Sequence, residues 1–86
     1  MIFIYKEFVK NNINKLTIEQ VKKFADKNSF TYSEEELVTV YNFIKYYYND
    51  LLDEDIKVFE NIRNDLNPKL YKDLLNLYIE YKQKYL

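Results

Sequence analysis

The chain has 86 residues and a formal net charge of −1, with 48% hydrophobic and 31% charged residues. This balance excludes an intrinsically disordered chain, because such chains combine low hydrophobicity with high net charge. Glycine is absent and proline occurs once, which disfavours β-hairpins because their tight turns rely on glycine at positive φ. The composition therefore predicts a single all-α domain over residues 1–86.

Two helices are predicted in the first third of the chain. Apolar residues at helical spacing indicate a first helix over residues 2–12, followed by a break near residues 12–16. Thr17 and Gln20 then form a capping box that starts a second helix, over residues 18–27. Because the chain has no glycine, Asn28 is the expected C-cap in the left-handed conformation. The spaced apolar residues of the first helix are Ile2, Tyr5, Phe8, Val9 and Ile13.

The stretch from Tyr32 to Tyr48 predicts the central helix of the fold, over residues 34–48. Ser33 and Glu36 form a second capping box at its start. The apolar side chains cover an arc wider than the roughly 100° stripe of an ordinary surface helix, so this helix needs neighbours on more than one side. The members of this arc are Leu37, Val40, Tyr41, Phe43, Ile44, Tyr47 and Tyr48.

The second half of the chain predicts two further helices, which completes a compact bundle of about five short helices around the helix near residues 34–48. Asp53 is the expected N-cap of the fourth helix, which runs to about Asp65. Asn67 and Pro68 fit the N-cap and N1 positions of a last helix that ends near residue 85. That helix is about 27 Å long, so we expect its neighbours to leave part of its apolar surface uncovered. Its second, narrower apolar stripe consists of Leu75, Ile79 and Leu86.

The sequence contains no histidine and no cysteine. It therefore lacks the most common general base, the usual transition-metal ligands and any thiol or Ser-His nucleophile, and we expect no enzyme activity, no metal and no cofactor. The absence of cysteine also excludes disulfides and fits a reducing compartment. The apolar residues 1–5 are too few to span a membrane or to form a signal-peptide core. We expect a cytoplasmic protein that does not interact with membranes.

One dense acidic cluster and one pair of helices invite functional interpretations. The cluster lacks the spacing of an EF-hand loop, so capping and solvation explain it better than weak binding of divalent cations. Its members are Asp50, Asp53, Glu54 and Asp55.

The helices at 18–27 and 34–48 superficially resemble a helix-turn-helix. The second of them, however, would begin with Glu34, Glu35 and Glu36 against DNA phosphates, and the chain has a single arginine for reading guanine. Nucleic acid is therefore an unlikely partner. The alternative kept open is weak, nonspecific backbone binding through lysines near the C-terminus. These lysines are Lys69, Lys72, Lys82 and Lys84.

Exposed positions that could contact another protein are the best candidates for function. The second stripe of the last helix fits a homodimer contact or a partner helix. Tyr46 is predicted to point outward, whereas Tyr47 and Tyr48 face the core, and the richness in tyrosine can reflect either function or base composition. The acidic residues between 28 and 60 either complement the basic ends of the chain or face a basic partner. The candidate interface comprises Leu75, Ile79, Leu86, Tyr46, Glu34 and Glu35.

Capping and core signals follow one another in four segments, which are Asn14-Lys15-Leu16-Thr17-Ile18-Glu19, Phe24-Ala25, Ser33 to Leu37, and Asn67-Pro68. Their order resembles the YqfT-like family of small bacterial proteins, a domain of unknown function. The resemblance spans nearly the whole chain, and it implies a small helical cytoplasmic protein without transferring any functional residue. We therefore expect a helical protein that acts through protein contacts, as an adaptor, a regulator or a self-associating module.

Overall fold

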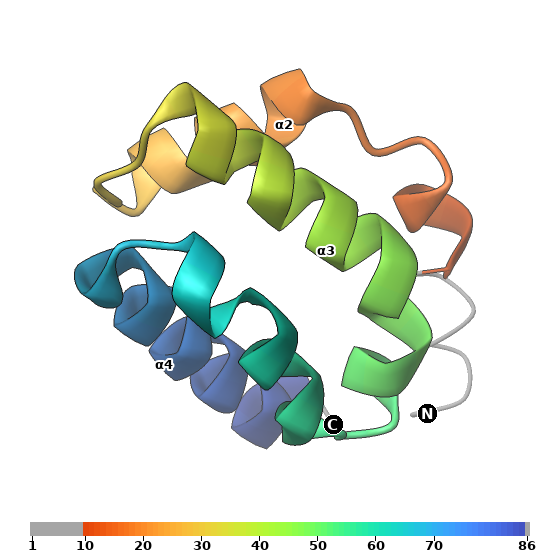
Figure 1. Cartoon of the computed structure of the whole chain (residues 1–86). Helices are drawn as coiled ribbons and strands as arrows, with labels where there is room; N and C mark the ends of the chain where they lie inside the picture. The colour runs from red at the N-terminus through yellow and green to blue at the C-terminus, as the bar shows by residue number, and fades with distance from the viewer. Residues whose placement is uncertain (1–9, 86) are drawn as a thin grey trace.

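The computed structural model describes residues 10–85, which form helices joined by short turns (Figure 1). The predicted all-α class is therefore confirmed. Most of the helix predicted over residues 2–12 lies outside the described residues, and residues 10–13 are helical. A turn at residues 14–15 agrees with the expected break. The elements that follow are α2 (Ile18–Lys27), α3 (Glu34–Leu52), the 3-10 helix η1 (Ile56–Asp65) and α4 (Pro68–Tyr85).

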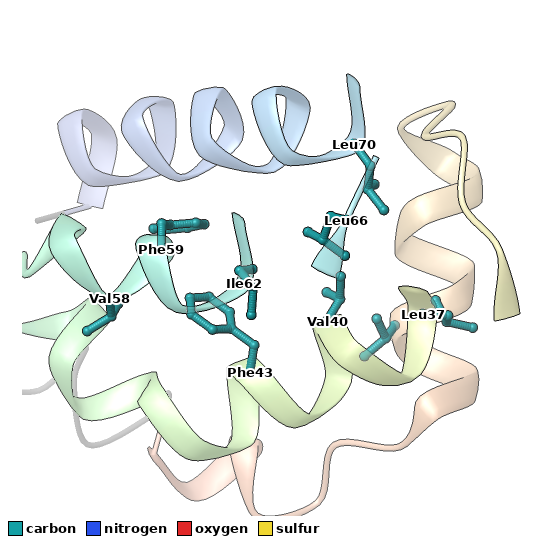
Figure 2. Packing of buried hydrophobic residues seen from close by; sticks show 9 residues of the cluster. Leu37, Val40, Phe43, Val58, Phe59, Ile62, Leu66 and Leu70 are labelled. Carbon is teal, nitrogen blue, oxygen red and sulfur yellow. The ribbon is translucent and has the colours of Figure 1, made fainter. Parts of the chain in front are cut away.

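Helix α3 occupies the centre of the molecule. It packs against α2 and against η1, and η1 in turn packs against α4, so α2 and α4 lie on opposite sides of Figure 1. The buried residues come from every one of these elements, as Figure 2 shows for α3, η1 and the start of α4. The expectation that the central helix has neighbours on more than one side is confirmed.

Phe59 of η1 links the central helix to the last one. Its ring centroid lies 5.1 Å from that of Phe43 on α3 and 5.3 Å from that of Tyr78 on α4. Both phenylalanines are buried, and burying a side chain of this size contributes roughly 1.5–3 kcal/mol. This aromatic chain holds α4 to the rest of the fold.

The two predicted capping boxes are confirmed atom by atom. Thr17 Oγ1 accepts a hydrogen bond from the Gln20 amide at 3.2 Å, and Gln20 Oε1 accepts one from the Thr17 amide at 3.0 Å. Ser33 and Glu36 repeat this reciprocal pair at the start of α3. Local sequence alone therefore determines where these helices begin.

Two predicted boundaries in the middle of the chain are wrong. Helix α3 continues past Tyr48 to Leu52, because Leu52 adds another buried side chain to its inner face. The following element is a 3-10 helix capped by Asp55 rather than an α-helix capped by Asp53. Phe59 and Ile62 lie three residues apart and are both buried, which suits the three residues per turn of a 3-10 helix.

The left-handed residue after α2 is Ser29, with φ of 59°, and not Asn28, whose φ is −94°. The amide of Phe30 donates to the Ala25 carbonyl and the amide of Ser29 to the Asp26 carbonyl, which is the Schellman arrangement. Helix α3 ends in the same way, with Glu54 at φ 65°. Asn28 is therefore the C-cap, as predicted, but the left-handed conformation lies one position later, at Ser29.

Candidate protein-binding groove

An apolar groove with a volume of about 450 Å³ lies between α2 and α4, and α3 supplies residues between them. Apart from Gln20, the described residues that line it are aliphatic or aromatic. The groove is open to solvent, because the side chains of Phe24 on α2 and Tyr81 on α4 remain 49% and 36% exposed. The main lining residues are Gln20, Val21, Phe24 and Ala25 on α2, Val40, Phe43, Ile44 and Tyr48 on α3, and Leu70, Leu74, Leu77, Tyr78 and Tyr81 on α4.

The groove exists because the apolar surfaces of α3 and α4 are larger than the surface that α2 can cover. Helix α2 buries Val21 and Ala25, and Phe24 lies beside them at the edge of this face. Helix α4 buries Leu70 at its start, but Tyr81 near its end is partly exposed. The expected uncovered apolar surface on the last helix is present on its main face.

The polar groups in the groove are already used within the fold. The side-chain oxygen of Gln20 accepts a hydrogen bond in the α2 capping box. The Tyr78 hydroxyl donates to the Leu51 carbonyl, and burial raises the pKa of Tyr78, so its phenol is neutral at pH 7. None of the described lining residues is charged. The groove can therefore bind apolar surface, but it offers little for orienting a polar ligand.

Glu36 connects the start of α3 to the start of α4. Its carboxylate accepts hydrogen bonds from the backbone and side-chain amides of Asn67, in addition to that from the Ser33 amide. These bonds, the one from the Asn67 backbone first, hold the pKa of Glu36 below its ordinary value of 4.5. The Asn67 side chain also donates to the Thr31 carbonyl and accepts from the Leu70 amide, which makes it the predicted N-cap of α4. This junction fixes how α3 and α4 meet at one end of the groove.

A second link joins α2 to the segment that leads into α3. The Tyr32 hydroxyl donates a hydrogen bond of 2.6 Å to the Asp26 carboxylate. This bond is the main reason why the pKa of Tyr32 is raised to about 12. Tyr32 also lines the groove, so the link holds α2 and the wall of the groove together.

None of the described residues in the predicted interface lines the groove. Leu75 is half-buried against the core, and Ile79 is partly exposed one turn further along α4. Tyr46 points outward as predicted and is 78% exposed. Its ring makes an edge-to-face contact with the ring of Tyr47. Glu34 and Glu35 are exposed in the first turn of α3. Leu86 lies outside the described residues.

The acidic cluster after α3 has roles in helix termination and capping. Asp53 is the C-cap of α3, Glu54 adopts the left-handed conformation, and the Asp55 carboxylate accepts from the Lys57 amide. Within residues 10–85, no three acidic side chains come close enough together to hold a metal ion.

The groove was not predicted from the sequence, although the sequence contains a signal for it. The wide arc of α3 and the main face of α4 together carry more apolar side chains than the narrow stripe of α2 can cover. The sequence does not tell how the helices are oriented relative to one another. This orientation places Phe24 and Tyr81 on the two borders of one groove.

No helix in the described part of the chain is long and apolar enough to cross a membrane. Comparisons with known proteins give no match, whether to a family model, to a curated protein or to a solved structure. The resemblance to the YqfT-like family therefore remains an expectation from the sequence.

Proposed function

We propose that this protein is a binding module that holds an amphipathic helix of a protein partner in the groove between α2 and α4. The observation that carries the proposal is the open apolar lining, with Phe24 and Tyr81 partly exposed on opposite borders. A continuous apolar surface of this kind on a folded protein is typical of a binding site. Function through protein contacts also agrees with a sequence that lacks histidine and cysteine.

A helix suits this groove better than an extended peptide or a polar small molecule. A helix satisfies its own backbone hydrogen bonds, so only its apolar side chains have to be accommodated. An extended strand would bring unpaired N–H and C=O groups against an apolar lining, which is costly. Small-molecule sites also need a few fixed polar groups, and those of Gln20 and Tyr78 are engaged within the fold.

The role that follows is that of an adaptor or regulator, which acts by holding its partner rather than by changing it chemically. The cysteine-free sequence favours a reducing compartment, and the cytoplasm is the proposed location.

The test uses a labelled synthetic helix of about four turns, with leucines along one stripe and glutamines along both edges. Fluorescence anisotropy should report binding to the wild type and at least about a tenfold weaker affinity for Phe24→Glu and for Tyr81→Glu. A carboxylate in an apolar contact loses its hydration, and a tenfold change corresponds to only about 1.4 kcal/mol.

Val38→Glu is the matched control, because Val38 is 44% exposed on α3 and does not line the groove. This variant should bind the peptide as the wild type does, and circular dichroism should give the same helicity for all variants. Equal affinity of Phe24→Glu and Val38→Glu, or no binding of the leucine peptide to the wild type, would refute the proposal.

A further inference from the structure

The border of the groove on α2 is positively charged. Lys23 and Lys27 follow Gln20 and Phe24 by three residues each, so each lysine neighbours a groove residue on the helix surface. Both lysines are exposed. Within residues 10–85, neither has an ion-pair partner. The result is a pair of lysine ammonium groups one helical turn apart along this border.

The border on α4 has no uniform charge. Asp73 lies one turn before Leu77 and forms an ion pair of 3.0 Å with Lys69. Glu80 is exposed three residues after Leu77, and Lys84 follows Tyr81 at the same spacing. Only the α2 border therefore has lysines at both of these positions, and the one carboxylate beside it, that of Asp26, accepts a hydrogen bond from Tyr32.

We propose that the partner helix is acidic, with carboxylates one turn apart along the edge that faces Lys23 and Lys27. This inference rests on the proposed function, since it assigns the chemistry of the helix that the groove holds. Carboxylates at positions i and i+4 of a helix recur at the same spacing as the two lysines, so both pairs can form along two aligned helices. The apolar stripe supplies affinity, and the charged edge determines which helices bind and in which orientation.

The described surface of a second copy of this chain does not offer such a helix. The exposed apolar residue Ile79 on α4 has Lys82 as a neighbour on the helix surface, and this lysine would face lysines of the groove border. On α3 the outward residues Val38 and Tyr46 are two turns apart and do not form a continuous stripe. The partner is therefore a different protein.

The test compares three peptides that share the leucine stripe and differ only in the residues of one edge, which are glutamate, glutamine or lysine. At low salt the glutamate peptide should bind the wild type about tenfold more tightly than the lysine peptide, from two exposed ion pairs. The difference should shrink as salt is added, because the Debye length falls from about 30 Å at 0.01 M to about 3 Å at 1 M. The double variant Lys23→Glu, Lys27→Glu should reverse the preference.

The matched control is Lys57→Glu, Lys72→Glu, which changes the net charge equally at exposed positions that do not line the groove. This variant should keep most of the preference for the glutamate peptide. If both double variants change the preference equally, the net charge and not the α2 border is responsible, and the inference is wrong.

Other outcomes separate this inference from the proposed function. Equal binding of all three peptides contradicts the inference but leaves the groove as a helix site. If none of the three peptides binds the wild type, both the inference and the proposed function are wrong. If the peptides bind strongly to the Phe8→Glu variant but not to the wild type, the groove belongs to residues 1–9 of this chain, and the assignment to a partner is wrong. Duplex DNA that binds the wild type and not Lys23→Glu, Lys27→Glu would mean that the border serves nucleic acid instead.

Discussion

Among the three glutamates that begin α3, Glu36 is the one that joins distant parts of the chain. It closes the capping box with Ser33 and also accepts hydrogen bonds from the backbone and side-chain amides of Asn67, which lies 31 residues away in the sequence. The first role could be predicted, because a capping box depends on residues three positions apart. The second could not, because it depends on where the chain returns after η1.

Replacing Glu36 by Gln should lower the free energy of unfolding by about 1 kcal/mol at pH 7, since an NH2 group that cannot accept from Asn67 replaces one carboxylate oxygen. Urea unfolding measures this loss. Because the folded-state pKa of Glu36 lies below 4.5, its stabilising contribution is complete above pH 4.5 and disappears as the pH falls through the folded-state pKa. The difference in the free energy of unfolding between the wild type and Glu36→Gln should therefore become smaller in that acidic range. Glu35→Gln, at an exposed neighbour, should change stability by less than about 0.5 kcal/mol at pH 7.

At the scale of the elements, the helix starts at Thr17, Ser33 and Asn67 and the ends of α2, η1 and α4 were predictable, but the end of α3 and the start and 3-10 type of η1 were not. Thr17, Ser33 and Asn67 act on amides within three residues, so their sequence pattern is sufficient. The extension of α3 to Leu52 depends instead on burial against other elements. The 3-10 geometry of η1 depends in the same way on which side chains meet the core. Neither is encoded in a short window of sequence.

The ends of α2 and α3 place non-glycine residues in the left-handed conformation, which costs roughly 1–2 kcal/mol for an L-residue. Glu54→Gly should therefore raise the free energy of unfolding by about 0.5–1 kcal/mol, after allowing for the greater freedom of glycine in the unfolded chain. Chemical denaturation gives the value. The control is Asp53→Gly, because Asp53 has φ of −87° and glycine relieves no strain there. A gain in stability for Asp53→Gly as large as that for Glu54→Gly would contradict this explanation.

At the scale of the whole molecule, the groove arises from packing between helices that are far apart in the sequence. Phe24 and Tyr81 border the same groove although 57 residues separate them (81 − 24). Periodicity identified both as apolar helix residues, but it could not place them around one opening. The interface predicted on the second stripe of α4 stays a prediction, because Ile79 is 36% exposed but does not line the groove.

The proposed groove also predicts how the whole fold responds to its ligand. A domain of this length is stable by roughly 4–13 kcal/mol, from about 0.05–0.15 kcal/mol per residue. A peptide that binds only the folded state at 100 times its Kd should add about 2.7 kcal/mol to the free energy of unfolding. The leucine peptide with glutamine edges should produce this increase in urea unfolding of the wild type, and a much smaller one in Phe24→Glu at the same peptide concentration. If anisotropy reports binding but the unfolding midpoint does not move, the peptide binds the unfolded chain equally well, and the folded groove is not its site.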